Sequence, residues 1–299
     1  MLAPIPLLLL GLALVAVMFV YTWWRSASGG HPHRPPTLLQ LGLGAVTLFF
    51  DTLGIGNYAP TTAAFRFLKM VRDEYIPGTL NVGTSVPVAV EAFAFVAAIA
   101  VDPITLLVMV PIGALGGWVG ASIVSGLPRR PIQFGMGAAL LTGAVLMFLT
   151  NMQWIPGGGE AIGFSGATLV FATAVNFVLG ALNALGIGSY APSLIIFSLL
   201  GMSPRSAFPI MMGSAAYMLP LAGIRFARAG KYDGQAALGI ALGGIPGVLV
   251  AAYVVKSLEL ATIRWLVVAV VLYAGLSLLR TATADRASAA AGARADASI

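Results

Sequence analysis

An eight-residue segment of this chain occurs twice, as Leu53-Gly54-Ile55-Gly56-Asn57-Tyr58-Ala59-Pro60 and as Leu185-Gly186-Ile187-Gly188-Ser189-Tyr190-Ala191-Pro192. Seven of the eight positions are identical, at an offset of 132 residues. Two glycines followed by a proline interrupt an apolar helix, because glycine tolerates positive φ and proline suits the first turn of the next helix. The repetition therefore predicts two related helix breaks.

The composition around these breaks is that of a membrane protein. Of the 299 residues, 59% are hydrophobic and 9% are charged, and the apolar residues form continuous runs. Soluble chains carry about 25% charged residues, so the composition excludes a soluble enzyme or a disordered chain. Continuous runs also disfavour an outer-membrane barrel, whose strands alternate polar and apolar residues. We therefore predict an all-α, polytopic membrane protein whose principal partner is the lipid bilayer.

Eleven apolar runs are predicted as membrane spans. A helix needs roughly 20 apolar residues to cross the hydrocarbon core. Two of the runs, 58–70 and 190–201, are short and need neighbours that shield their ends. The eleven runs are 4–24, 37–54, 58–70, 79–99, 103–126, 132–150, 162–184, 190–201, 206–226, 235–255 and 262–279.

Basic residues orient these spans. With the N-terminus outside and every run crossing, thirteen Lys and Arg fall on one side and three on the other. Because cytoplasmic loops are rich in Lys and Arg, we predict a bacterial-type cytoplasmic membrane with the C-terminus inside. The thirteen are Arg25, Arg34, Arg66, Lys69, Arg72, Arg129, Arg130, Arg225, Arg228, Lys231, Arg280, Arg286 and Arg294, and the three are Arg205, Lys256 and Arg264.

Further matches extend the repeat beyond the two breaks. Gly83-Thr84 corresponds to Gly213-Ser214, and a later Gly-Gly-x-x-Gly at 116–120 corresponds to 243–247. Each half holds five runs, so the second half starts on the opposite face, which predicts an inverted-topology repeat of 5+5 helices. A duplicated bundle without a pathway is the alternative. The predicted parts are 1–36, an N-terminal anchor helix and linker; 37–150, repeat 1; 151–161, an extracytoplasmic linker; 162–280, repeat 2; and 281–299, a poorly ordered cytoplasmic tail.

The first predicted helix has an alternative interpretation. A cleaved signal peptide carries its basic residues before the apolar run, whereas Arg25 follows the run 4–24. A retained anchor is therefore favoured.

The two breaks are the predicted binding site for a small anion. Broken helices leave free N–H groups that lipid cannot satisfy, and helix N-termini favour negative charge. Neutral donors beside the breaks would hold an oxyanion without trapping it; the alternative is that Ser and Thr bond carbonyls of their own helices. The predicted substrate-binding residues are Gly54, Gly56, Asn57, Tyr58, Asn81, Thr84, Ser85, Gly186, Gly188, Ser189, Tyr190 and Ser214.

Two acidic residues lie inside apolar runs. Asp51 precedes the first break, where the second half has the neutral Asn183, and Glu91 lies within 79–99. A carboxylate at membrane depth is costly, so we treat both as candidates for proton coupling. The alternatives are a protonated carboxyl bonded to a backbone carbonyl, and Asp51 acting as a helix cap.

The sequence lacks the residues that metal binding, enzyme catalysis or nucleic-acid binding would need. His31 and His33 lie in a proline-rich linker without a third ligand, so no metal site is predicted. The chain has no cysteine, no nucleotide loop with its lysine and no hydrolase motif, so we predict no catalytic residues, no enzyme activity and no cofactor. The basic residues are scattered between apolar runs, which indicates topology rather than nucleic-acid binding.

The repeated Gly-Ile-Gly-x-Tyr-Ala-Pro segments and the later Gly-Gly-x-x-Gly helix resemble the sulfite exporter family, TauE/SafE, over about 37–280. Asn57 and Ser189 stand where that family commonly has a third glycine. The resemblance implies a permease for sulfite, sulfonates or related organosulfur anions, driven by ion gradients.

Together these patterns predict a secondary transporter of small anions that works by alternating access, with proton coupling as a hypothesis. The alternatives are a passive anion channel of the same fold, a carrier of small carboxylates, and a membrane-embedded enzyme or scaffold.

Overall fold

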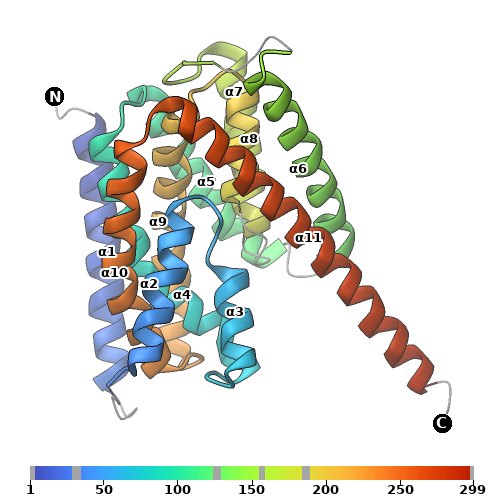
Figure 1. The fold of residues 1–299 in the computed structure, drawn as a ribbon. Helices are drawn as coiled ribbons and strands as arrows, with labels where there is room; N and C mark the ends of the chain where they lie inside the picture. Colours follow the sequence, from blue (N-terminus) through green and yellow to red (C-terminus); the bar gives the residue numbers. More distant parts are fainter. Residues whose placement is uncertain (1–3, 29–34, 124–128, 155–158, 184–188, 297–299) are drawn as a thin grey trace.

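The computed structural model describes residues 4–28, 35–123, 129–154, 159–183 and 189–296. All named elements in these residues are helices (Figure 1). They are α1 (Pro4–Ser28), α2 (Leu38–Thr52), α3 (Tyr58–Phe67), the 3₁₀ helix η1 (Asp73–Tyr75), α4 (Ile76–Ala98), α5 (Pro103–Ile123), α6 (Arg129–Asn151), α7 (Gly166–Asn183), α8 (Tyr190–Leu199), α9 (Pro204–Ala229), α10 (Gly234–Ser257) and α11 (Leu260–Asp296).

The prediction of a polytopic, all-helical membrane protein is confirmed. Within the described residues, eight helices are long and apolar enough to cross a membrane, namely α1, α4, α5, α6, α7, α9, α10 and α11. The other three α-helices are shorter. α2 has 15 residues, and α3 and α8 have 10 each. At 1.5 Å per residue, a ten-residue helix is about 15 Å long, roughly half of the hydrocarbon thickness.

The short helices fold back on the helices that precede them. α2 and α3 are joined at mid-height of the molecule and return to the end where α2 starts (Figure 1). α7 and α8 behave in the same way at the other end. Phe164, just before α7, bonds Thr105, and Ala161 pairs with Met202, just after α8. The runs 58–70 and 190–201 therefore do not cross the molecule as separate spans.

The connecting segments gather at two ends. At the first, which we call the basic end, the Asp233 N–H donates to Thr79 Oγ1 (2.9 Å) and the Gln235 side chain donates to the Pro35 carbonyl (2.8 Å). At the second, which we call the opposite end, Arg205 donates to the Leu258 carbonyl. The C-terminus of α6 and the start of α11 also lie there (Figure 1).

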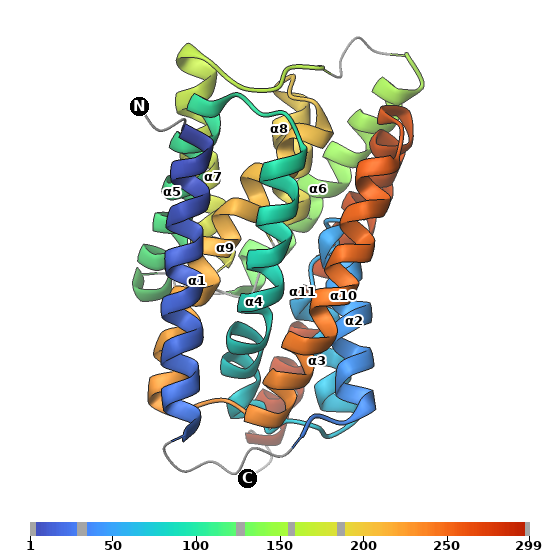
Figure 2. The same cartoon turned by 90° about the vertical axis from the view of Figure 1, so that its left-hand side faces the viewer.

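Helices of one predicted half pack on helices of the other. α2 packs on α10 and α7 on α5, so the first helix of each half contacts the fourth helix of the other. Likewise α4 packs on α9 and α6 on α11. In Figure 2, α4 runs through the middle of the molecule between α1 and α10, both of which it contacts. α1 lies outside the ten other helices and packs mainly on α9.

Glycines allow the closest of these contacts. A Cβ at Gly243 of α10 would collide with the backbone carbonyl of Leu41 in α2, and one at Gly116 of α5 would collide with the Phe177 carbonyl in α7. These are backbone-to-backbone approaches, which small residues permit in membrane helices. They confirm that the repeated glycines serve helix packing.

Gly243→Ala is expected to destabilise the protein. A Cβ here forces α10 away from α2, and overpacking of this kind costs about 1–3 kcal/mol. Gly42→Ala is the matched control, because a Cβ at Gly42 meets nothing within 4 Å. That change should be neutral or slightly stabilising. Thermal unfolding of the purified protein in detergent measures both, and equal unfolding temperatures would contradict the packing assignment.

The last helix extends beyond the apolar run 262–279 that the sequence predicts as the final span. α11 continues through Asp296, within the segment predicted as a cytoplasmic tail. The segment is rich in alanine and arginine, both of which are strong helix formers. The α-helical geometry therefore persists beyond the apolar span.

Candidate functional site

The first break is a helix C-cap followed directly by a helix N-terminus. The Gly54 N–H donates to the Asp51 carbonyl (2.7 Å) and the Ile55 N–H donates to the Phe50 carbonyl (3.2 Å). This pair of bonds is a Schellman motif, which needs a left-handed residue at its end. Gly54 has φ +93° and Gly56 has φ +86°. The prediction that these glycines adopt positive φ is confirmed.

Asp51 occupies the N-terminus of α3. The Asn57 side chain donates to Asp51 Oδ2 (2.7 Å), and the Asn57 backbone N–H also bonds this carboxyl group. α3 has no side-chain cap of its own. Since a helix N-terminus favours a negative group, the first break carries an internal anion at the position where a solute anion would bind.

Glu91 is buried beside Asp51 without a hydrogen-bond partner. It lies on α4 and is 0% exposed. Neither of its carboxyl oxygens has a hydrogen-bond partner among the described residues, and Asp51 is close enough to interact with it electrostatically. Asn57 Oδ1 is also buried and unpartnered. A buried pair of carboxyl groups without a neutralising cation needs a bound proton or cation to be stable.

The second break approaches the same carboxyl pair. Tyr190, at the start of α8, is buried and interacts electrostatically with Glu91, Asp51 and Tyr58. A Cβ at Gly54 would lie 2.7 Å from Leu194 Cδ1, on α8. The described parts of the two breaks therefore meet in the interior. Gly186 and Gly188, predicted as site residues, lie outside the described residues.

The second break carries no acidic side chain at the position of Asp51. Asn183 stands there, at the end of α7, and its Nδ2 faces Met218 Sδ at 3.9 Å. α8 begins at Tyr190 without a side-chain cap from Ser189. Among the described residues the two helix N-termini thus differ: Asp51 lies at that of α3, and no side chain caps that of α8.

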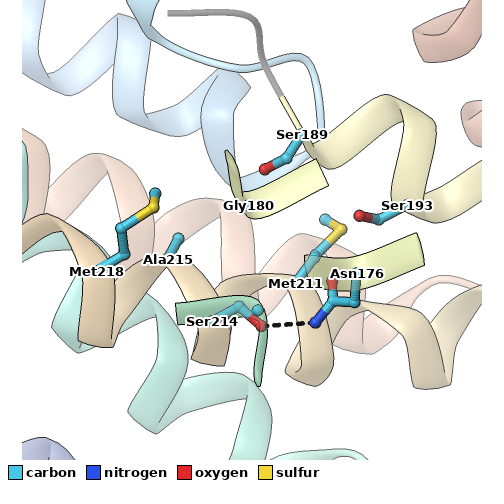
Figure 3. A pocket seen from close by; sticks show the side chains of 9 residues that line it. Asn176, Gly180, Ser189, Ser193, Met211, Ser214, Ala215 and Met218 are labelled. Atoms are coloured by element: carbon cyan, nitrogen blue, oxygen red, sulfur yellow. Dashed lines mark hydrogen bonds between the residues drawn. The ribbon is translucent and has the colours of Figure 1, made fainter. Parts of the chain in front are cut away.

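A small polar pocket lies at the N-terminus of α8 (Figure 3). Asn176 of α7 donates to Ser214 Oγ of α9 (3.1 Å) and to the Met109 carbonyl (2.8 Å). In Figure 3 the hydroxyls of Ser189 and Ser193 lie on the other side of the pocket. The lining residues are Gly113, Asn176, Gly180, Ser189, Ser193, Met211, Ser214, Ala215 and Met218, and they border about 260 Å³ of empty space, open solvent included.

Three predicted residues lie on α4, and one of them, Asn81, bonds Tyr58. Asn81 Oδ1 accepts a hydrogen bond from the Tyr58 hydroxyl (3.3 Å). Thr84 and Ser85 are buried, and their hydroxyls donate to the carbonyls of Leu80 (2.8 Å) and Asn81 (2.6 Å) on their own helix. For these two hydroxyls the structure agrees with the alternative reading, in which they bond their own helix.

Asn176 and Ser193 line the pocket but are absent from the sequence-based set. Asn176 is an amide in the middle of the apolar run 162–184, and it is 3% exposed. A polar side chain at the centre of a membrane span is a signal in its own right. Ser193 lies one helical turn after Ser189, a spacing that places both on one face of α8.

Metal-binding geometry is absent from the described residues, which contain no group of three or more His, Asp or Glu placed to hold a metal ion. Comparison with family models, with curated proteins and with solved structures gives no match for this chain. The site must therefore be interpreted from its own chemistry.

Proposed function

We propose that this protein is a secondary transporter of small monovalent oxyanions in a bacterial-type cytoplasmic membrane, with its basic end in the cytoplasm. The two halves form an inverted repeat, and alternating access arises from movement between them. The reciprocal pairing of α2 with α10 and of α7 with α5 supports the repeat. Sulfite and short sulfonates are the favoured substrates, on the resemblance described above.

One observation carries the proposal. Tyr58 and Tyr190 come from the two breaks and approach one buried carboxyl pair, Asp51 and Glu91. Interrupted helices that meet in the membrane interior, beside buried ionisable groups, are typical of the substrate and coupling sites of secondary transporters.

The transported anion binds at the N-terminus of α8. The hydroxyls of Ser189 and Ser193 supply donors beside the helix N-terminus, and the described residues that line the pocket include no cationic side chain. Neutral donors and a helix N-terminus hold an anion while still permitting its release. α3 does not serve this purpose, because Asp51 already occupies its N-terminus.

A proton on the carboxyl pair couples to the anion. Glu91 is the proton carrier, because the Asn57 side chain donates a hydrogen bond to Asp51 that favours its charged form, whereas neither carboxyl oxygen of Glu91 has a partner of hydrogen-bond geometry among the described residues. An anion at the N-terminus of α8 is repelled by a doubly charged pair and tolerated by a protonated one. Anion and proton therefore bind together and move in the same direction.

Transport by the purified protein in liposomes tests this proposal. Labelled sulfite, methanesulfonate and small carboxylates are offered with and without a pH gradient. We expect uptake that depends on the gradient, together with exchange of internal for external anion. A passive channel would conduct without counterflow. An enzyme or scaffold would move none of these anions, and that result would contradict the proposal.

A further inference from the structure

A second pocket lies at the opposite end of the molecule, where α6 ends, α8 ends and α11 begins. It encloses about 290 Å³ of empty space, the open solvent at its mouth included. It is separated from the pocket of Figure 3 by the length of α8, about 15 Å for ten residues. The lining residues are Met147, Thr150, Asn151, Ser198, Leu199, Met202, Pro204 and Arg264.

Three hydrogen-bonding groups in this pocket are buried and have no partner among the residues that the structure describes. They are Asn151 Nδ2 on α6, Ser198 Oγ on α8 and Arg264 Nε on α11. Ser198 is 4% exposed. Buried donors are normally hydrogen-bonded, so three unpartnered ones in a single pocket indicate a ligand that accepts hydrogen bonds.

The pocket also carries a positive charge that is only weakly neutralised. The nearest acidic group to Arg264 is Glu160, at 4.0 Å, and the Glu160 side chain is 78% exposed. An ion pair at this distance with a solvated partner is weak. The guanidinium therefore retains most of its capacity to bind an anion.

Arg264 also departs from the charge pattern of the chain. Only three of the sixteen basic residues are predicted on the side away from the cytoplasm, and Arg264 is one of them. Basic residues that orient a membrane protein lie on its cytoplasmic side. This arginine therefore needs another reason for its position, and the unpartnered donors around it supply one.

We propose that this pocket is a second anion site, which binds one small oxyanion, a carboxylate or a sulfonate, between Arg264, Asn151 and Ser198. The planar guanidinium holds two oxygens of the anion, and the amide and hydroxyl donate to the remaining lone pairs. The binding itself does not depend on transport. Its place at the outer end of α8 makes it the first site for an anion approaching the central pocket, and this role rests on the proposed function.

The absence of cysteine gives a direct test. In Thr150→Cys, the only thiol lines the pocket while all three donors stay in place. Its reaction rate is measured in non-ionic detergent with two methanethiosulfonate reagents, one bearing a sulfonate and one a trimethylammonium group. We expect the sulfonate reagent to react at least about tenfold faster than the trimethylammonium reagent. Methanesulfonate or acetate in solution should slow the reaction of the sulfonate reagent, because these anions occupy the same site.

Two variants complete the test. When Arg264→Gln is added to Thr150→Cys, the two reagents should react at similar rates, and methanesulfonate or acetate should no longer slow the reaction. Ser165→Cys, an exposed residue of the same end, should show neither. Equal rates in Thr150→Cys, or a preference that survives Arg264→Gln, would overturn the proposal. Protection by phosphatidylglycerol but not by soluble anions would overturn it too, because the site would then belong to lipid phosphate.

The failure of this site is distinguishable from failure of the proposed function. If transport occurs but the labelling is insensitive to charge, the outer site is wrong and the central pocket stands. If the labelling behaves as expected but no anion is transported, the outer site stands alone.

Discussion

Glu91→Gln is expected to abolish accumulation of the anion driven by a pH gradient. With one proton carried per anion, the wild-type protein should accumulate substrate about tenfold per pH unit, since one proton gains about 1.4 kcal/mol per unit. Glutamine keeps the size of the side chain but cannot exchange a proton. The accumulation ratio in liposomes should therefore fall to about one, while exchange of internal for external anion continues.

Retention of the fold is expected for this variant, because Glu91 has no hydrogen bond to lose. Asp73→Asn is the control. Asp73 is an exposed carboxylate that pairs with Arg66 at 2.9 Å, outside the buried cluster, and its loss should leave the accumulation ratio unchanged. If Glu91→Gln still concentrates the anion against its gradient, the proton is carried elsewhere.

Asn183→Asp is expected to abolish anion binding at the central pocket. The change gives the second break a carboxylate at the sequence position that corresponds to Asp51, and by analogy with the first break we expect this charge to lie near the N-terminus of α8. Two like charges about 5 Å apart at an effective dielectric constant of 20 repel by roughly 3 kcal/mol, or about 200-fold in Kd. Titration calorimetry with sulfite measures the loss.

A neutral replacement separates charge from shape at this position. Asn183→Ser removes the amide without adding charge, and it should change Kd by no more than about tenfold, because among the described residues the amide makes only a weak hydrogen bond, to Met218 Sδ at 3.9 Å. If Asn183→Asp binds the anion as tightly as the wild-type protein does, the N-terminus of α8 is not the anion site.

The local features of the breaks could be predicted from sequence. Gly54 and Gly56 adopt positive φ, which glycine does without the Cβ clash that most other residues would meet, and a repeated Gly-x-Gly pattern indicates that requirement directly. The sequence could not show that the short helices do not cross the membrane. Two full crossings bring the chain back to the side where it started, and so does a hairpin of two half-length helices. The number of basic residues on each side is therefore the same in both cases.

The two breaks differ in charge, which the near-identity of their sequences does not suggest. Asn183 has an amide nitrogen where Asp51 has a carboxylate oxygen. Only the structure shows that the Asp51 carboxylate lies at a helix N-terminus, where it accepts a hydrogen bond from the Asn57 side chain. Asn176 was missed because a single polar residue in an apolar run does not reveal which neighbour it faces. That depends on the packing of α7 on α5.

The reciprocal pairing of the two halves has a consequence for synthesis at the ribosome. α2 rests on α10, which starts at Gly234, so most of the chain has been translated before α2 acquires its partner. Until then the surface of α2 that packs on α10 faces lipid or the insertion machinery. A nascent chain truncated before residue 234 is left with an unmatched surface, and we expect proteases of the membrane to degrade it.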